Sequence, residues 1–152
     1  MHIVLIEPEI HWNTGNIGRT CVATGTTLHL VGKLGFSLEA KELKRAGLDY
    51  WPKLQLVQHA DFAAFLAGLP PDPSLLLFTT KATKKFWDAP YQTDSYLVFG
   101  KESAGLPEDI RARFSDRLYR IPILAGERSM NLSNCAAVAL FEGLRRCAYP
   151  GI

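Results

Sequence analysis

Residues 97–107 read Leu-Val-Phe-Gly-Lys-Glu-Ser-Ala-Gly-Leu-Pro. A short apolar run ends at Phe99 and passes directly into a loop rich in Gly and Ser that opens a helix. The pattern recurs downstream: Arg120–Ile123 leads into a polar loop and then into residues 128–134, Arg-Ser-Met-Asn-Leu-Ser-Asn. Ligands of α/β proteins bind where loops follow strands. The two loops therefore predict one shared ligand site built mainly of backbone hydrogen-bonding groups.

Short, unbroken apolar runs alternate along the chain with stretches of helical periodicity. We expect strands at 3–6, 28–31, 54–57, 75–79, 96–99 and 118–123, and helices at 15–24, 39–46, 61–66, 107–114 and 131–146. Continuous rather than alternating hydrophobicity indicates strands covered on both faces, which favours parallel pairing. The prediction is an α/β fold with a mostly parallel, open sheet of five or six strands and helices on both faces. A chain of 152 residues is expected to form a single domain, residues 1–152.

Composition excludes several classes of protein. A hydrophobic content of 47% and a charged content of 21% are ordinary for a globular chain, and a net charge of +2 does not by itself indicate nucleic acid. Lysines clustered at 81–85 and basic residues at 41–45 still allow a locally basic face. The three cysteines lack CxxC spacing and the four histidines are scattered, so no metal site is expected. Without a signal peptide or a membrane-spanning stretch, we expect a cytoplasmic protein that does not contact membranes.

The last predicted helix, residues 131–146, is apolar over most of its circumference. A helix of this kind needs cover on two sides. The sheet can cover one side, and either a second subunit or the rest of a monomer must cover the other. Because no chain is left over to do so, the sequence favours a homodimer.

Residues 13–19, Asn-Thr-Gly-Asn-Ile-Gly-Arg, follow the first strand, where a dinucleotide-binding fold would carry GxGxxG. The glycine spacing does not match, and no Walker pattern occurs, so neither a Rossmann oxidoreductase nor a P-loop nucleotidase is supported. Asn13 or Thr14 could simply cap the helix that follows. Capping explains neither Asn16 nor Arg19. The guanidinium of Arg19 could pair with a phosphate near the helix N-terminus.

Glu102 allows two interpretations. It could act as a general base, or it could accept hydrogen bonds from backbone amides, which is the commoner role of a lone carboxylate in a loop. The residues alone leave this choice open.

Taken together, residues 13–19, 97–107 and 120–134 resemble the three motifs of the SPOUT superfamily of knotted RNA methyltransferases, in the same order and over essentially the whole chain. The chain is most similar to the short tRNA 2′-O-methyltransferases that modify the wobble nucleotide. Residues 7–10, 45–50, 78–81 and 129–134 carry that similarity. The resemblance implies a deep C-terminal trefoil knot, in which the last segment is threaded through a loop.

The same resemblance implies S-adenosylmethionine as the cofactor, S-adenosylhomocysteine as the product, and no metal. The cofactor would lie bent between the knot loops, in contact with Phe78, Thr79, Gly100, Ile121, Ser129, Met130 and Leu132. The substrate would be the ribose of nucleotide 34, a cytidine or modified uridine, in the anticodon loop of tRNA. The alternatives are a 2′-O-methyltransferase of rRNA or of another tRNA position, and a catalytically silent RNA-binding homologue.

The implied catalytic residues are Arg19, Asn16, Glu102 and Asn131. Arg19 would hold the phosphate beside the target ribose and either help to deprotonate the 2′-oxygen or stabilise it electrostatically. The electrostatic role is favoured, because a free arginine is too basic to be neutral. The other three would orient the substrate or complete the cofactor loop. In members of the family, the arginine of one subunit faces the cofactor of the other, which makes the homodimer a condition of activity.

Four residues depart from the family pattern on the presumed RNA side. Relatives tend to have Pro-Pro where this chain has His11-Trp12, and Lys101 and Ala104 occupy positions that are more often neutral and basic, respectively. Trp12 and Tyr50 could stack on a splayed anticodon base or pack in the core.

Overall fold

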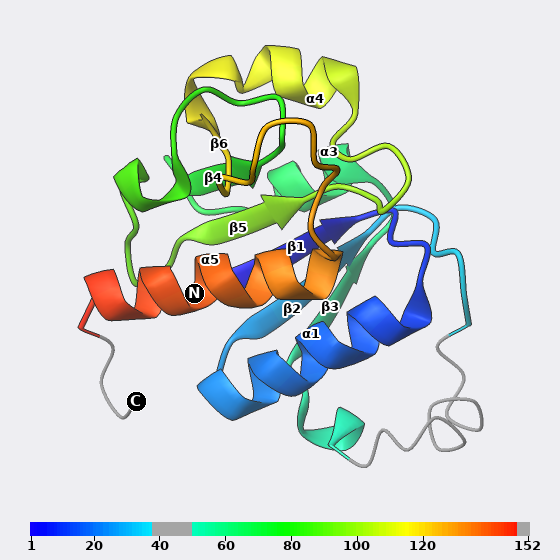
Figure 1. Cartoon of the computed structure of the whole chain (residues 1–152). Coiled ribbons are helices and arrows are strands. Elements are labelled where there is room, and N and C mark those ends of the chain that lie inside the picture. Colours follow the sequence, from blue (N-terminus) through cyan, green and yellow to red (C-terminus); the bar gives the residue numbers. More distant parts are fainter. Residues whose placement is uncertain (38–49, 149–152) are drawn as a thin grey trace.

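The structure is a computed structural model that describes residues 1–37 and 50–148. Its six strands form one parallel sheet in the order β3-β2-β1-β5-β4-β6 (Figure 1). The strands are β1 (His2–Ile6), β2 (Thr27–Val31), β3 (Leu56–His59), β4 (Leu75–Phe78), β5 (Tyr96–Phe99) and β6 (Leu118–Tyr119). The helices are α1 (His11–Thr24), α3 (Phe62–Ala67), α4 (Glu108–Arg113) and α5 (Leu132–Arg146), with short 3-10 turns η1 (Trp51–Lys53), η2 (Phe86–Asp88) and η3 (Ser115–Arg117). The expected helix at 39–46, the basic cluster at 41–45 and the motif residues 45–49 lie outside the described residues.

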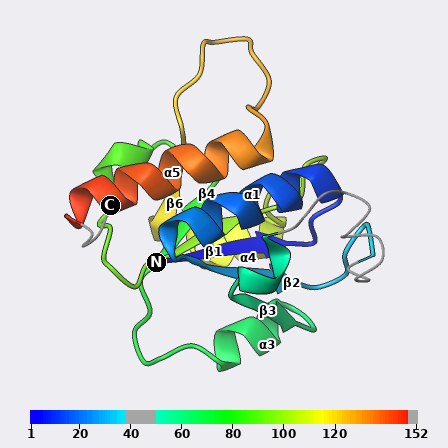
Figure 2. The same cartoon turned by 90° about the horizontal axis from the view of Figure 1, so that it is seen from below.

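Two hydrophobic cores lie on opposite faces of the sheet. On one face, α1 and α5 lie side by side and pack over residues such as Ile3, Leu5 and Leu97 (Figures 1 and 2). On the other face, α3 and α4 cover residues that include Val4 and Leu77. Neighbouring residues of one strand thus enter different cores, which explains the unbroken apolar runs and confirms the predicted parallel α/β sheet.

Two strands, β3 and β6, differ from their predicted ranges by more than one residue. The last strand ends at Tyr119 rather than at residue 123, since Pro122 has no N–H to donate to a ladder. Only Arg120 continues the pairing, as an isolated bridge to Lys85. The third strand begins at Leu56 rather than at residue 54, because Leu54 closes the η1 turn by donating its N–H to the Trp51 carbonyl oxygen at 3.0 Å.

Helix α1 begins at His11, four residues earlier than predicted, so the expected capping role of Asn13 or Thr14 is wrong. Both residues lie inside the first turns of the helix and are buried. Ile10 occupies the N-cap position, and its side chain makes no capping hydrogen bond. The early start follows from a partner distant in sequence, since the Glu102 carboxylate accepts hydrogen bonds from the N–H groups of Glu9 and Ile10, which immediately precede the helix.

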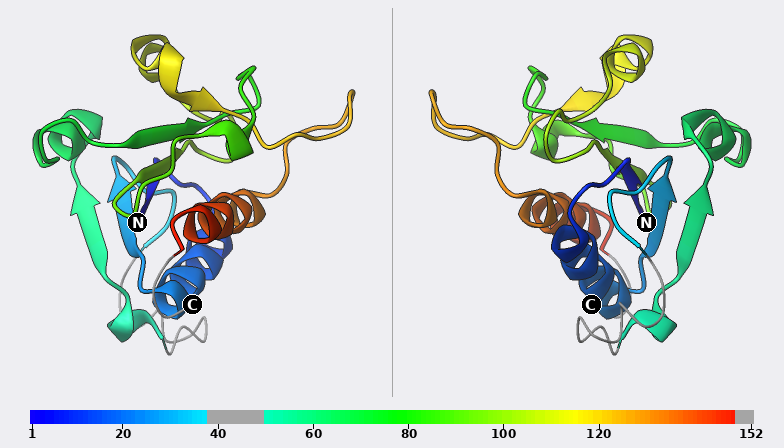
Figure 3. Two further views of the ribbon diagram at one scale, coloured as in Figure 1. Left: turned by 90° about the vertical axis from the view of Figure 1, so that its left-hand side faces the viewer. Right: turned by 90° about the vertical axis from the view of Figure 1, so that its right-hand side faces the viewer.

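The connection between β6 and α5 extends away from the body of the molecule (Figure 3). Leu124 within it is 81% exposed. Within residues 1–37 and 50–148, no helix combines the length and apolarity that crossing a bilayer requires.

Candidate functional site

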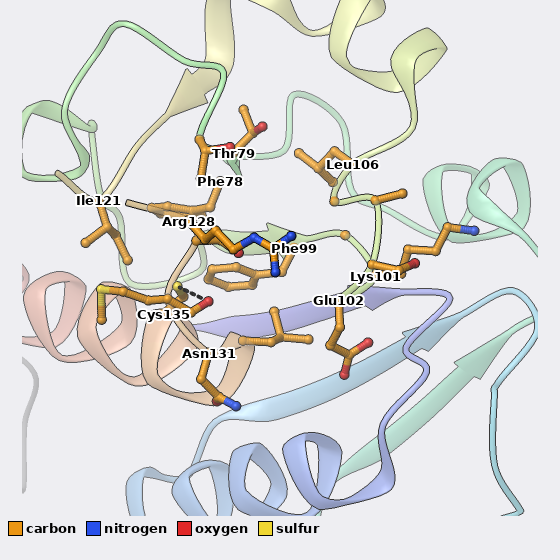
Figure 4. A pocket seen from close by; sticks show the side chains of 18 of the residues that line it. Phe78, Thr79, Phe99, Lys101, Glu102, Leu106, Ile121, Arg128, Asn131 and Cys135 are labelled. Carbon is orange, nitrogen blue, oxygen red and sulfur yellow. Dashed lines mark hydrogen bonds between the residues drawn. The ribbon is translucent and has the colours of Figure 1, made fainter. Parts of the chain in front are cut away.

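A cavity of about 670 Å³ lies at the carboxyl ends of β4 and β5 and beside the chain that follows β6 (Figure 4). The lining residues are Ile10, Asn13, Phe78–Lys81, Phe99–Leu106, Arg111, Ile121, Ile123, Arg128–Leu132 and Cys135. The two loops that the sequence singled out therefore face one another across a single cavity. Its position at the strand ends is the usual one for ligands of open α/β sheets.

Nine of the eleven predicted site residues line this cavity. They comprise the seven expected at the cofactor, Phe78, Thr79, Gly100, Ile121, Ser129, Met130 and Leu132, together with Glu102 and Asn131. Asn16 and Arg19 do not line it, and both are exposed on α1. The Arg19 guanidinium lies 5.0 Å from the centre of the Tyr50 ring.

The floor of the cavity is apolar and partly aromatic. The rings of Phe78 and Phe99 are stacked, with centroids 4.9 Å apart and planes inclined by 14°. Ile121 and Leu132 add aliphatic surface from the other loop. An apolar floor edged by the backbone of two loops suits a flat heterocycle whose polar edge is read by the main chain.

Position 100 requires glycine because two backbone segments approach each other closely there. A Cβ atom at this position would lie 2.0 Å from the carbonyl carbon of Gly105, so no side chain can be accommodated. Gly105 itself has a φ of 70° and donates its N–H to the Lys101 carbonyl oxygen at 2.8 Å. The loop after β5 is thus folded tightly back on itself, which leaves its backbone groups at the cavity edge.

Three polar side chains join the loop after β5 to the starts of α1 and α5. The Glu102 carboxylate accepts hydrogen bonds from the side-chain amide of Asn13 at 2.9 Å and from the N–H of Glu9 at 2.8 Å. Asn13 accepts in turn from the side-chain amide of Asn131 at 2.9 Å. The Asn131 oxygen caps α5 by accepting the N–H of Ser133 at 2.9 Å. Glu102 therefore has the contacts of the backbone-amide acceptor, one of its two sequence-based interpretations.

A second pair of contacts ties the β1–α1 loop to the β5–α4 loop. Lys101 and Glu7 form an ion pair at 2.9 Å, and Glu7 adopts a φ of 47°, unusual for a residue with a side chain. Hydrogen bonds from Ser103 to the Glu9 carboxylate, both 2.9 Å long, hold the pKa of Glu9 below its ordinary value. The hydrogen bond with Glu7, and then the negative charge of Glu7, raise the pKa of Lys101 above its ordinary value. Lys101, one of the departures from the family pattern, thus supports the loop that leads into α1.

Asn13 is a site residue that sequence reasoning missed, because it was interpreted only as a helix cap. It is 5% exposed, lines the cavity and bridges Glu102 and Asn131. Its position in the segment that follows the first strand was visible in the sequence. The pairing of β1 with β5, which brings it to Glu102, was not.

The aromatic residues proposed to stack on RNA have different surroundings. Trp12 is 65% exposed on α1, which excludes the core-packing alternative for it within this chain. Tyr50 is half-buried and donates its hydroxyl to the Gly15 carbonyl oxygen. Among residues 1–37 and 50–148, no cluster of His, Cys, Asp or Glu is arranged to hold a metal ion.

Comparison with known proteins places these features among RNA methyltransferases. The profile of the SpoU rRNA Methylase family matches residues 1–141. The tRNA (cytidine(34)-2'-O)-methyltransferase of Saccharophagus degradans is 46% identical over 151 residues, which cover 99% of this chain and 97% of the relative. A solved structure from work on the "2-OH methylation of C/U34 on tRNA" superposes with a TM-score of 0.89 at 44% identity, covering 95% of this chain and 94% of that one.

A more distant structure shares the fold alone. The SpoU methyltransferase AviRb from Streptomyces viridochromogenes, solved in complex with AdoMet, is 22% identical with a TM-score of 0.77 and covers 96% of this chain and 60% of its own.

Proposed function

Since the chain belongs to the SpoU rRNA Methylase family, we propose that it transfers the methyl group of S-adenosylmethionine to the ribose 2′-oxygen of nucleotide 34, cytidine or modified uridine, in tRNA. The observation that carries this proposal is the cavity, because its lining includes all seven residues that the family resemblance assigns to the cofactor. The full-length similarity to a tRNA (cytidine(34)-2'-O)-methyltransferase supports the choice of substrate.

The residues present fit S-adenosylmethionine. The stacked Phe78 and Phe99 and the aliphatic Ile121 offer apolar cover for an adenine ring. Backbone groups around Gly100 can read its polar edge, since no side chain intervenes there. The cofactor supplies an electrophilic methyl group on a sulfonium, and the transfer leaves S-adenosylhomocysteine.

Methyl transfer requires the 2′-oxygen to be placed in line with the methyl group. As the O–CH3 bond forms and the S–CH3 bond breaks, the 2′-hydroxyl proton passes to solvent water. Placement of two reactants can contribute on the order of 7–11 kcal/mol. We assign placement to Asn131 and Asn16. We assign to Glu102 the support of the β1–α1 loop, through backbone N–H groups of that loop, and of the start of α1, through the Asn13 side chain. Arg19 binds the phosphate beside the target ribose and stabilises negative charge on the 2′-oxygen.

Arg19 and Asn16 reach a cavity only if a second subunit presents it, so we propose a homodimer with composite sites. Both residues lie outside the cavity of their own chain. The outward faces of α1 and α5 carry Trp12, Val138 and Phe141, which are 65%, 38% and 50% exposed. Apolar surface of this kind on neighbouring helices supports burial against a second copy.

We also propose the trefoil knot. The connection from β4 to β5, residues 79–95, contacts both ends of the segment that would be threaded. Phe86 donates its N–H to the Arg120 carbonyl oxygen at 2.9 Å, at the end of β6. Arg146, at the end of α5, donates to the Trp87 carbonyl oxygen at 3.2 Å. The β4–β5 connection thus contacts the chain at both ends of the segment from β6 to α5. Such contacts support a fold in which that segment passes through the loop.

The family description names rRNA, so a 2′-O-methyltransferase of rRNA is the second candidate. Incubation with labelled S-adenosylmethionine and either total tRNA or rRNA, followed by mapping of the methylated nucleotide, separates the two. Label at nucleotide 34 is expected, and label confined to rRNA would replace the first proposal by the second. Since its substrate is tRNA, we place the enzyme in the cytoplasm.

Arg19→Ala tests the mechanism. We expect turnover to fall by at least about 100-fold, while cofactor affinity, measured by calorimetry, stays within about twofold because the proposed partner of Arg19 is the RNA phosphate and not the cofactor. Near-normal turnover would remove Arg19 from the mechanism.

A further inference from the structure

The lining of the cavity carries more positive than negative charge. Among residues 1–37 and 50–148, the lining includes four cationic residues, Lys81, Lys101, Arg111 and Arg128, and one acidic residue, Glu102. The carboxylate accepts three hydrogen bonds from the β1–α1 loop and the first turn of α1. The Glu102 carboxylate is therefore already occupied by these hydrogen bonds, and it does not neutralise the cationic side chains.

Two of the four cations already have partners. Lys101 forms its ion pair with Glu7, and the Nε of Arg111 donates to the Leu106 carbonyl oxygen at 3.2 Å. The side chains of Lys81 and Arg128 have no hydrogen-bond or ion-pair partner within residues 1–37 and 50–148. Both are exposed. They are available to a ligand without first breaking a contact to the described part of the chain.

The two unpaired cations come from different loops at the mouth of the same cavity. Lys81 lies in the turn after β4, and Arg128 lies in the extended connection that precedes α5. The Arg128 side chain extends from that connection over the cavity in Figure 4. An anion between them would contact both loops at once, outside the apolar floor formed by Phe78 and Phe99.

Charge decides between the two anionic groups that could bind there. S-adenosylmethionine has one carboxylate, but its ammonium and sulfonium give it a net positive charge, so additional cations around it are unfavourable overall. An RNA chain has one negative charge for every nucleotide and gains from each cation that it meets. We propose that Lys81 and Arg128 bind the phosphate backbone of the substrate RNA at the mouth of the cavity, next to the target nucleotide. This inference rests on the proposed function and assigns part of its RNA-binding surface.

The test uses the full chain with Lys81→Gln, Arg128→Gln and the double variant. Arg113→Gln is the matched control, because Arg113 is an exposed arginine of α4 that does not line the cavity and lies over the ring of Phe114. The dissociation constant of an anticodon stem-loop RNA is measured from 50 to 200 mM salt, and the affinity for S-adenosylmethionine is measured by calorimetry.

Each cavity variant is expected to weaken RNA binding about threefold to tenfold, and to reduce the slope of log K against log salt by about 0.7 for each cation removed. Cofactor affinity should stay within about twofold. Lys81→Arg should retain the wild-type salt slope, and Arg113→Gln should leave both measurements unchanged. Circular dichroism confirms that each variant is folded.

Two results would overturn the inference. An unchanged RNA affinity and salt slope in the double variant would show that these cations do not contact the backbone. A loss of cofactor affinity with intact RNA binding would assign them to the cofactor carboxylate instead. Because the salt slope does not require methyl transfer, failure of wild-type protein to methylate nucleotide 34 would reject the proposed function separately.

Discussion

The side-chain amide of Asn131 donates a hydrogen bond to the side-chain oxygen of Asn13 at 2.9 Å. These residues are 118 positions apart in sequence, and Asn13 in turn donates to Glu102. The first turns of α1 and α5 are thereby fixed relative to the loop after β5. Because Asn131 also caps α5, one residue sets both the start of that helix and its position at the cavity.

Asn13→Ala removes the centre of this chain of hydrogen bonds. Asn13 is 5% exposed, so its loss leaves the Asn131 amide without its acceptor and leaves the Glu102 Oε1 atom with only the longer hydrogen bond from the Ile10 N–H, at 3.3 Å. We expect the free energy of unfolding to fall by about 1–3 kcal/mol, measured by urea denaturation. Asn16→Ala, an exposed position one turn further along α1, is the control and should change stability by less than about 0.5 kcal/mol. Equal stabilities of the two variants would show that the bridge contributes nothing.

Gly100→Ala forces a methyl group into the backbone of Gly105, 2.0 Å away. The loop after β5 must then open, which we expect to cost about 3 kcal/mol or more and to abolish cofactor binding. Calorimetry with S-adenosylhomocysteine and thermal melting measure the two effects. Gly68→Ala is the control, since its nearest atom would be 3.6 Å away. Cofactor binding at wild-type affinity by Gly100→Ala contradicts the close approach.

Acid should destabilise the protein through a row of three histidines on β1, β2 and β3. His29, 8% exposed, lies 3.1 Å from His2 and 3.0 Å from His59, measured between ring nitrogens. Burial first, then the charges of His2 and His59, lower the pKa of His29 to about 4. Burial also lowers the pKa of His2 and of His59.

Because the folded pKa of His29 lies below the unfolded value of about 6.5, the folded state binds fewer protons. The contribution of neutral His29 to the free energy of unfolding is therefore fully present above about pH 6.5 and is lost as the pH falls towards 4. At pH 5 the loss is on the order of 2 kcal/mol. Urea denaturation between pH 4 and 8 measures this loss. His29→Gln should flatten the profile, whereas His11→Gln, on the exposed start of α1, should not. A profile that His29→Gln leaves unchanged contradicts the assignment.

Composite sites predict complementation between two inactive variants. Arg19→Ala removes the arginine that a subunit contributes to the site of its partner. Gly100→Ala disrupts the cofactor cavity of the subunit that carries the substitution. In a mixed dimer both defects fall on one site and leave the other site intact. Differently tagged chains, co-expressed and purified as the mixed dimer, should regain about half of wild-type activity. A mixed dimer as inactive as its parents argues against exchange of Arg19 between subunits.

The local pattern of the sequence was sufficient for the elements and for most of the cavity. Unbroken apolar runs located every strand to within a few residues, because residues buried in both cores leave no polar positions. The position of the cavity at the strand ends was predictable for a similar reason, whereas its seven cofactor residues were predicted from the family resemblance. Parallel strands end at one edge, so loops after strands such as β5 must lie near one another.

Helix and strand boundaries that depend on residues distant in sequence were not predictable. The early start of α1 requires the Glu102 carboxylate at the N–H groups of Glu9 and Ile10, 93 and 92 residues away. The early end of β6, by contrast, depends on Pro122, a local signal that the apolar run obscured.

The sequence by itself determined the parallel α/β class, the strand-end site and the glycines that keep it open, since these depend on local hydrophobicity and backbone freedom. Only the tertiary structure decided that β1 lies beside β5, that Asn13 bridges Glu102 and Asn131, and that Arg19 lies outside its own cavity. Strand order brings together residues about 90 to 120 positions apart, and the periodicity of a chain contains no information on which strand will be the neighbour of another.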